Sequence, residues 1–438
     1  MIAPEHLYAY FLQHPQICTD TRQLTPGCLF FALKGENFDG NRFTEQALAG
    51  GAACVVIDDP GAQLNDRCLL VPDVLLALQQ LARHHRRQFE IPVIAIGGSN
   101  GKTTTKELVS AVLSSHYPCH FTKGNLNNHI GVPLTLLAMP AHTEVAIIEM
   151  GTNQPGDIAM LCAIAEPTHG LLTNIGKEHL EGFGSLAGVK KAEGELFTYL
   201  EQRQGCAFVN LSEKYLSAMA QHVRQRVAYL RTVRKPATGS VIKVQALPGT
   251  PQLRAVFLDE QDRPVEVRTQ LLGRHNFHNV MTAIALGSYF KVPAAKIKAA
   301  IEAYTPSNNR SQVLQRDSTT ILLDAYNANP SSMLPALEML RELPTGRKVA
   351  ILGDMLELGA ESEKEHADVL HRAARMGFDA LVLVGPEFGK TDYARYKARH
   401  FADTAAAKAW FDRQNFDQTS ILIKGSRGIR LEKLVAEE

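Results

Sequence analysis

The sequence predicts an α/β protein with three domains: a small N-terminal α/β domain, a central domain with a mostly parallel sheet covered by helices on both faces, and a C-terminal Rossmann-like domain. Three observations predict this. A chain of 438 residues is long enough for about three domains. Apolar strand-like segments alternate with segments of helical periodicity over most of the chain. One strand-like segment ends in glycines, a lysine and threonines before a helical segment begins.

Residues 1–82 are predicted to form the small first domain. The segments "GCLFFALKG" and "AACVVIDD" are its strongest strand candidates, because they are apolar and are bounded by turn residues. The helical segment "LLALQQLARHHRRQF" follows and leads into the next domain.

Residues 83–305 are predicted to form the central domain. The segments "IPVIAIGG", "TEVAIIEMG", "HGLLTNIG" and "CAFVN" alternate with helices, which is typical of a parallel sheet covered on both faces. Within this domain, residues 240–272 contain three alternating segments that predict an antiparallel meander.

Residues 306–438 are predicted to form the third domain, which begins with the polar linker "PSNNRSQ". The segments "TTILLDAY", "RKVAILGD", "ALVLVG" and "SILIKGS" again alternate with helices, although no G-x-G-x-x-G motif is present. This alternation predicts a second doubly wound sheet.

The composition excludes several classes of protein. A net charge of +1 and the lack of a long basic run argue against a nucleic-acid partner. No apolar run approaches the ~20 residues of a membrane helix, and the first residues lack the basic segment of a signal peptide. Seven widely spaced cysteines without a C-x-x-C pair predict reduced thiols. We therefore expect a cytoplasmic protein without a membrane partner, and a monomer.

The segment "IPVIAIGGSNGKTTTKELVSAVL" carries the clearest chemical signal. Small residues between a strand and a helix let backbone N–H groups surround phosphate oxygens at the positive end of the helix. Lys102 would reach the outer phosphates, and the Thr103 hydroxyl would bind Mg²⁺. The alternative is a glycine-rich turn with an unrelated lysine, but the flanking strand and helix favour phosphate binding. The predicted nucleotide-binding residues of this loop are Gly98, Ser99, Asn100, Gly101, Lys102, Thr103 and Thr104.

Two further polar residues follow strands of the central sheet, where open α/β sheets bind ligands. Glu149 ends its strand and is suited to holding the Mg²⁺ that bridges ATP phosphates. His179 follows the next strand. Because Mg²⁺ prefers oxygen ligands, a lone histidine here would more often be an ordinary loop or core residue, unless a second metal ion is needed.

The motifs "GGSNGKTTTKE", "TKGNLNNHIGVPLTLL", "AIIEMGTNQPGDI", "LTNIGKEHLEGFGS", "LLGRHNFHNVMTAIAL" and "LLDAYNANPSSM" resemble, in this order, those of the Mur ligases. The resemblance spans nearly the whole chain. "TDTRQLTPGCLFFALKGENFDGNRF" and "ILGDMLELG" look like the member that adds D-alanyl-D-alanine to UDP-N-acetylmuramoyl-tripeptide in peptidoglycan precursor synthesis. A member that adds a single amino acid is the alternative, although the D-N-P-R signature of the diaminopimelate-adding ligase is missing.

The resemblance implies that ATP phosphorylates the peptide carboxylate and that the amine of the dipeptide then attacks the acyl phosphate. It implies catalytic roles for Lys102, His179 and Glu193. The implied Mg²⁺ ligands are Thr103, Glu149, His179 and Glu193. The other implied ATP contacts are Asn276 and Asn279, at the adenine, together with Arg310 and Asp324. The implied substrate contacts are Thr21, Arg22, Lys34, Gly35, Asp39, Gly40, Asn127 and Asn128; those of the first domain would bind the uridine-diphosphate end, and the alternative for them is a capped turn and a tight loop. The stretch Lys424 to Arg427 ("KGSR") follows the last strand and is a candidate anion site for the dipeptide carboxylate. From residue type alone, Arg310 and Asp324 are more often a linker ion pair and a strand-end cap.

Glu193 departs from the family pattern. In most Mur ligases this position carries a lysine that takes up CO₂ and binds the second Mg²⁺, and a glutamate would supply a similar anionic oxygen on a stem three atoms shorter. Three alternatives are open: Glu193 binds the metal, directly or through a water; Lys190 is carbamylated instead; or Glu193 is an ordinary solvated helix residue.

A nucleotide-dependent switch protein with a similar phosphate-binding loop is a rival from another class. Such a GTPase should carry an N-K-x-D motif after a later strand, and the nearest string, "TKGN", lacks the aspartate. A non-catalytic UDP-sugar-binding module is a second rival, but it does not predict that Lys102, Glu149 and His179 are all intact.

Overall fold

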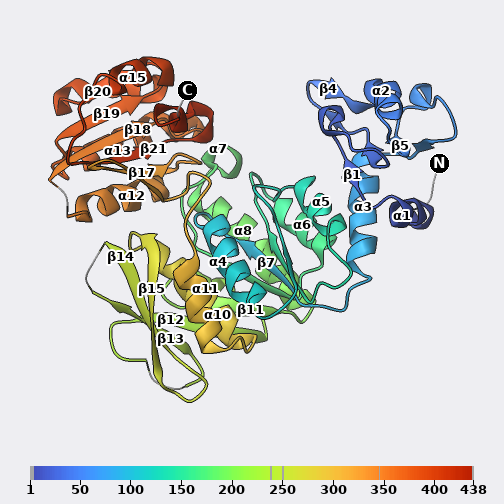
Figure 1. Ribbon diagram of the computed structural model, residues 1–438, viewed down its shortest axis with the longest axis horizontal. Helices are drawn as coiled ribbons and strands as arrows, with labels where there is room; N and C mark the ends of the chain where they lie inside the picture. Colours follow the sequence, from blue (N-terminus) through green and yellow to red (C-terminus); the bar gives the residue numbers. More distant parts are fainter. Residues whose placement is uncertain (1–3, 237–238, 249–250, 345, 437–438) are drawn as a thin grey trace.

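The structure is a computed structural model that describes residues 4–236, 239–248, 251–344 and 346–436. Three domains follow one another along the chain, and the first and third lie apart from each other on one side of the central domain (Figure 1). No helix in these ranges is long and apolar enough to span a membrane. All seven cysteines are free, and six of them are buried, which agrees with the predicted reduced thiols.

The first domain is a four-stranded parallel sheet in the order β1-β2-β5-β6, with a small antiparallel hairpin formed by β3 and β4. The predicted strands correspond to β2 and β5. The strands are β1 (Ile17–Cys18), β2 (Leu29–Phe31), β3 (Lys34–Gly35), β4 (Phe38–Asp39), β5 (Cys54–Ile57) and β6 (Cys68–Leu70), and the helices are α1 (Pro4–Gln13), α2 (Thr44–Ala49) and α3 (Val74–Arg86).

Helix α3 joins the first domain to the second. Asp73 caps its first turn by accepting a hydrogen bond from the backbone N–H of Leu76. The helix packs against α1 but also against α5 and α6 of the central domain, and Arg86 donates to the carbonyl of Ala165. The boundary expected after residue 82 therefore lies inside a helix that contacts both domains.

The central sheet has nine strands in the order β15-β14-β13-β12-β11-β10-β7-β9-β8. It is parallel from β8 to β13, and β13, β14 and β15 form the expected antiparallel meander. Strands β8 and β12 were not predicted from the sequence. The strands are β7 (Val93–Gly97), β8 (Cys119–Phe121), β9 (Val145–Glu149), β10 (His169–Leu172), β11 (Cys206–Asn210), β12 (Gln225–Thr232), β13 (Ile242–Leu247), β14 (Gln252–Leu258) and β15 (Pro264–Leu272).

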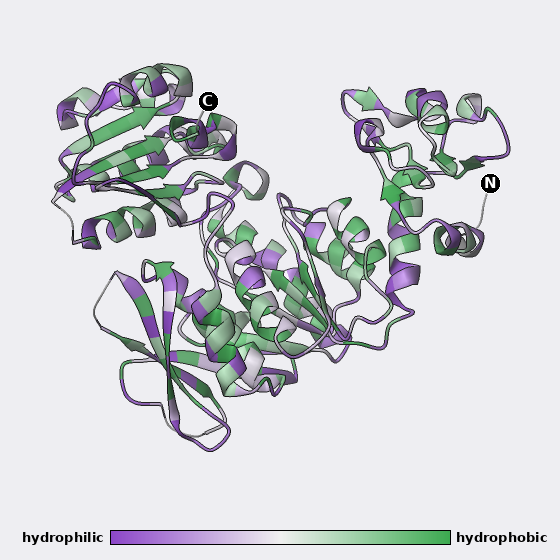
Figure 2. Ribbon diagram, in the orientation of Figure 1, coloured by the Kyte–Doolittle hydropathy of each residue, from purple (hydrophilic) through white to green (hydrophobic). Residues whose placement is uncertain are grey.

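Helices cover both faces of this sheet, as predicted. Alternate residues of β7 point to opposite faces, so Ala95 packs with the helices α3, α5, α6 and α8, whereas Ile94 and Ile96 pack with α4, α10 and α11. The central strands of this sheet are mainly hydrophobic, whereas the strands of the meander also carry hydrophilic segments (Figure 2). The helices are α4 (Lys102–Ser114), α5 (Gly131–Leu137), α6 (Asp157–Ala165), α7 (Leu180–Phe183), α8 (Leu186–Gln202), α9 (Leu216–Met219), α10 (Asn276–Tyr289) and α11 (Ala294–Ala303).

The third domain is doubly wound, with the sheet order β16-β17-β21-β18-β19-β20. Only the edge strand β16 is antiparallel to its neighbour. Two apolar cores lie on opposite faces of the sheet. The elements are β16 (Gln312–Arg316), β17 (Thr319–Asp324), α12 (Pro330–Glu342), β18 (Arg347–Gly353), α13 (Ser362–Ala374), β19 (Ala380–Val384), α14 (Pro386–Gly389), β20 (Arg399–Phe401), α15 (Thr404–Phe411) and β21 (Thr419–Lys424).

Candidate active site

The loop between β7 and α4 has the backbone of a phosphate-binding loop. Gly98 has φ +110° and Gly101 has φ +81°. Residues with a Cβ atom rarely adopt these positive φ angles, whereas glycine does so readily. A Cβ at Gly98 would also lie 2.4 Å from the Thr173 hydroxyl oxygen. The carbonyl and side chain of Asn174 accept hydrogen bonds from the N–H groups of the next two loop residues, at 2.9 and 3.1 Å. The loop is thereby fixed against the end of β10, with the N-terminus of α4 behind it.

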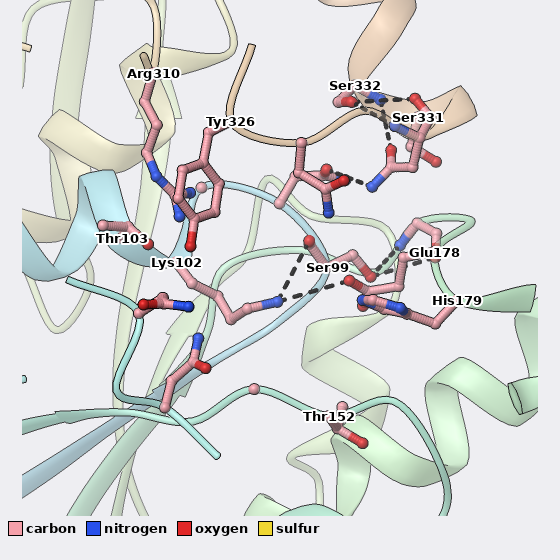
Figure 3. A pocket seen from close by; sticks show the side chains of 18 of the residues that line it. Ser99, Lys102, Thr103, Thr152, Glu178, His179, Arg310, Tyr326, Ser331 and Ser332 are labelled. Carbon is pink, nitrogen blue, oxygen red and sulfur yellow. Dashed lines mark hydrogen bonds and ion pairs between the residues drawn. The ribbon is translucent and has the colours of Figure 1, made fainter. Parts of the chain in front are cut away.

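The Lys102 ammonium lies back against its own loop. It donates to the carbonyls of Gly98 and Ser99 and lies 3.6 Å from Glu178 Oε2 (Figure 3). Nearby carboxylates, of which Glu178 interacts most strongly, raise the pKa of Lys102 although its burial acts in the opposite direction. The lysine is therefore a cation at the position where the phosphates of a nucleotide would lie.

Thr103 and Glu149 are brought together, as the sequence predicts. The Thr103 hydroxyl donates to Glu149 Oε1 at 3.0 Å, and the Asn127 amide donates to the same oxygen at 2.8 Å. Glu149 Oε2 is buried and has no hydrogen-bond partner; the Lys106 ammonium lies 4.0 Å from it. A hydroxyl and an incompletely partnered carboxylate are hard oxygen donors, so these residues fit a Mg²⁺ ion.

Glu193 lies behind the loop and does not line the cavity. Its side chain is fully buried, and Oε2 accepts the N–H of Gly98 at 2.8 Å. Burial raises the pKa of Glu193 to about 8, and the charge of Lys102 acts against this shift. The alternative that Glu193 is a solvated helix residue is therefore wrong. The Lys190 ammonium lies 4.4 Å from the centre of the Tyr215 ring, and this residue does not line the cavity either.

His179 connects the central domain to the third domain. Its Nδ1 lies 2.6 Å from Glu357 Oε2, and this contact holds the pKa of the Glu357 carboxyl below its usual value. His179 has φ +42° and Glu357 has φ +64°, so both ends of the contact adopt a left-handed backbone that costs energy outside glycine. The Asn329 amide also donates to Asn100 Oδ1 of the loop at 2.9 Å.

Two arginines of the third domain and its linker share one aromatic ring. The Arg310 guanidinium lies 3.7 Å from the centre of the Tyr326 ring, and that of Arg427 lies 5.2 Å from it. Neither arginine forms an ion pair with a described carboxylate, and Arg310 Nε is buried without a hydrogen-bond partner. The two guanidinium groups are therefore able to bind anions.

Lys424 and Asp324, by contrast, are already paired. Their side chains are 2.6 Å apart, and the Lys424 ammonium also donates to the Asn327 carbonyl. Lys424 is only 2% exposed. Asp324 also accepts the N–H of Ser311 at 3.0 Å. The charge of Lys424 is thus compensated inside the protein, which disfavours its predicted role in binding a substrate carboxylate.

The two asparagines expected at the adenine are adjacent at the start of α10. The Asn279 amide donates to Asn276 Oδ1 at 2.9 Å and its own oxygen accepts from Thr105. His275 precedes them, and burial lowers its pKa to about 4, so this histidine is neutral near pH 7.

These groups surround one cavity of about 700 Å³ between the central and third domains. Most of the site residues that were predicted from the sequence line this cavity, together with several that were not predicted. The predicted lining residues are Ser99, Asn100, Gly101, Lys102, Thr103, Thr104, Asn127, Asn128, Glu149, His179, Asn276, Asn279, Arg310, Asp324 and Lys424, whereas Gly98 and Glu193 lie outside the lining. No group of three or more His, Cys, Asp or Glu within the described ranges is arranged to hold a metal ion. A cation in this cavity would therefore need ligands from a bound molecule in addition to those from the protein.

The six predicted residues of the first domain do not line this cavity. Arg22 is ion-paired with Asp20 at 2.7 Å, next to Thr21 in a short 3₁₀ turn. Lys34 is ion-paired with Asp58 at 2.8 Å in the β3–β4 hairpin, which also contains Gly35 and Asp39 and precedes Gly40. Arg22, Lys34 and Gly35 are exposed to solvent, whereas Gly40 is buried.

Sequence reasoning missed Glu178, Tyr326 and Glu357 as cavity residues. Glu178 lies in the motif "KEHLEG" directly before His179, and Tyr326 lies in "DAYNANP" two residues after Asp324. This closeness to a predicted residue was the only sequence signal for their place in the cavity.

A phosphate-binding loop whose cavity is completed by a second doubly wound domain defines a multidomain nucleotide-binding protein. Family models agree along the chain: the Mur ligase family catalytic domain matches residues 15–86, the Mur ligase middle domain residues 96–287, and the Mur ligase glutamate ligase domain residues 309–427. The chain belongs to the Mur ligase family.

Individual relatives match over almost the full chain. The UDP-N-acetylmuramoyl-tripeptide–D-alanyl-D-alanine ligase of Escherichia coli (strain K12) is 38% identical over 96% of this chain and 92% of its own. The ligase of the same name from Bacillus subtilis (strain 168) is 34% identical with the same coverage. The crystal structure of MurF from Acinetobacter baumannii has a TM-score of 0.85, at 29% identity, over 99% of this chain and 97% of its own. MurF from Thermotoga maritima, solved in complex with ADP, has a TM-score of 0.81, at 25% identity, over 97% of each chain.

We expect that Gly98→Ala destabilises the loop and abolishes nucleotide binding. An alanine would be forced into a positive φ, and its Cβ would overlap Thr173. The free energy of unfolding should fall by about 1–3 kcal/mol. Chemical denaturation and calorimetric titration with an ATP analogue measure both effects. Gly239→Ala is the matched control, because a Cβ there meets no atom within 4 Å. Unchanged nucleotide binding in Gly98→Ala would contradict the role of the loop.

Proposed function

We propose that the protein is an ATP-dependent amide ligase that adds D-alanyl-D-alanine to UDP-N-acetylmuramoyl-tripeptide in peptidoglycan precursor synthesis. The observation that carries this proposal is the single cavity in which the loop lysine, the Thr103–Glu149 pair and two arginines without acid partners meet. The names of the full-length relatives supply the identity of the substrates.

The reaction proceeds in two steps. An oxygen of the tripeptide carboxylate attacks the γ-phosphorus of ATP, which forms an acyl phosphate and releases ADP. The neutral amine of the dipeptide then attacks the acyl carbon, phosphate leaves with the former carboxylate oxygen, and the amine loses a proton. The amide retains the other carboxylate oxygen.

The residues around the loop have distinct roles in the first step. Lys102 turns from its own loop carbonyls toward the transferred phosphoryl group and stabilises its charge. Thr103 and Glu149 would hold a Mg²⁺ ion, which would neutralise phosphate charge. Arg310 approaches from the linker with its guanidinium plane already fixed against Tyr326, so little rotational freedom is lost when it binds a phosphate.

Arg427, rather than Lys424, is the group suited to the dipeptide carboxylate. It lines the cavity in the loop after β21, its side chain is exposed, and no described carboxylate pairs with it. Its NH1 donates to the Tyr326 hydroxyl at 3.3 Å, which holds the guanidinium near the ring. A bidentate contact to a carboxylate would still be available on the remaining N–H groups.

The first domain is assigned to the uridine-diphosphate end of the substrate, on the polar surface around Arg22 and Lys34. We also propose that the three domains divide after residues 82 and 305, although the first of these positions lies within helix α3. Cytoplasmic location and the monomeric state stay predictions.

Phosphate release from ATP should require both UDP-N-acetylmuramoyl-tripeptide and D-alanyl-D-alanine. Lys102→Ala should reduce release to background because the transferred phosphoryl group loses its lysine, whereas Lys191→Ala, at an exposed helix position, should not. A coupled phosphate assay with product detection by mass spectrometry measures this. Hydrolysis without either substrate would contradict a ligase, and faster amide formation with a single amino acid would favour the other Mur ligases.

Arg427→Ala should raise the KM for D-alanyl-D-alanine by about 10–100-fold, because one charged hydrogen-bonded contact contributes about 1.5–3 kcal/mol. The KM values for ATP and for the UDP-tripeptide should change little. Arg430→Ala removes an exposed arginine outside the cavity and is the matched control. An unchanged dipeptide KM, or a raised KM for ATP alone, would contradict the assignment.

A further inference from the structure

Three buried carboxylates surround the phosphate-binding loop. Glu149 ends β9, Glu178 follows β10, and Glu193 lies on α8. Each has one buried oxygen without a hydrogen-bond partner, Oε2 in Glu149 and Oε1 in the other two. Buried carboxylates are rarely left in this condition, because an unpartnered anionic oxygen is costly away from water. Glu149 and Glu178, the two of these residues that line the cavity, are therefore incompletely compensated without further positive charge.

Glu193 is directed to the loop backbone and not to the cavity. Its Oε2 accepts the N–H of Gly98, and a Cβ placed on Gly97 would lie 2.9 Å from that same oxygen. The carboxyl group thus occupies the space that the missing side chain of Gly97 leaves behind the loop. For Glu193 to reach a cation among the nucleotide phosphates, this hydrogen bond would have to break and the side chain would have to pass the loop.

Glu178 is placed differently. It immediately precedes His179, and both residues line the cavity on the side of Lys102 (Figure 3). Its side chain is 4% exposed, and its ion pair with Lys102 is long, at 3.6 Å. No other described lysine, arginine or histidine lies within ion-pair distance of it. Among the residues that the structure describes, Lys102 is therefore the only cation that compensates Glu178.

Nucleotide binding removes this compensation. Once Lys102 turns toward the phosphates, Glu178 faces a highly anionic ligand across the cavity with no partner on Oε1. Like charges at this separation in a buried site repel strongly. A divalent cation between them removes the repulsion, and carboxylate and phosphate oxygens are the ligands that Mg²⁺ prefers.

We propose that Glu178 is the carboxylate that this chain offers to a second divalent cation, shared with the bound nucleotide and the peptide carboxylate, and that Glu193 instead supports the loop. This inference rests on the proposed function, because it requires ATP and an acidic substrate in the same cavity. It assigns separate roles to two glutamates that both lie near Lys102.

The test counts bound Mn²⁺, which is detected by the loss of the free-ion electron paramagnetic resonance signal. The full chain is titrated with Mn²⁺ in the presence of a non-hydrolysable ATP analogue and UDP-N-acetylmuramoyl-tripeptide. Wild type should bind two ions. Glu178→Gln should keep one and bind the second at least tenfold more weakly. Glu193→Gln is the matched control and should keep both, because its amide oxygen still accepts from Gly98.

Each other result contradicts the inference: one ion in wild type, wild-type affinity for both ions in Glu178→Gln, or loss of an ion in Glu193→Gln. Circular dichroism melting shows whether the variants fold. If Glu178→Gln does not, Glu178→Asp keeps the charge on a shorter stem, and an unchanged dissociation constant for the second ion in that variant would overturn the assignment. Analogue binding is recorded in the same samples. Wild type that fails to bind the analogue contradicts the proposed function, whereas binding with a single ion contradicts only this inference.

Discussion

The hydrogen bond from Gly98 to the buried carboxylate of Glu193 is the interaction on which the shape of the site depends. Such a hydrogen bond contributes about 0.5–1.5 kcal/mol, and a buried group left without its partner costs about 1–3 kcal/mol. It draws the loop backbone toward α8, which is possible only because Gly97 and Gly98 have no side chains. The residues at the start of α4, Lys102, Thr103 and Thr104, line the cavity next to this loop. Phosphate binding is thus prepared by a group that does not touch the phosphate.

The second constraint is that the site is completed only when the third domain lies against this loop. Asn329 donates to Asn100, Ser331 Oγ accepts the N–H of Lys177, and Glu357 pairs with His179. All three contacts join segments that follow the carboxyl ends of strands in two different sheets, which is where doubly wound folds bind ligands. Because these contacts are polar and lie at a domain junction, they can be exchanged for contacts to substrates without loss of a hydrophobic core.

The fold followed from the sequence to a large extent, because alternating strand and helix patterns are set by local periodicity. The short strand β8 and the exposed, polar β12 escaped prediction since neither has the continuous apolar run of a buried strand. The site was only partly predictable. Thr103 and Glu149 meet because strand ends in a parallel sheet converge, but the direction of a helix side chain such as Glu193 depends on packing. The same limit applies to Lys424, whose compensation by Asp324 arises from neighbouring strands far apart in sequence.

The central claim is that the loop and the third domain hold the γ-phosphate of ATP against the peptide carboxylate so that an acyl phosphate forms. Tripeptide substrate labelled with ¹⁸O in its terminal carboxylate tests this claim directly. We expect one labelled oxygen in the released phosphate and one in the amide for each turnover, as measured by mass spectrometry. Unlabelled phosphate, with amide formed at the normal rate, would contradict the account, because the carboxylate oxygen would then never have been joined to phosphorus.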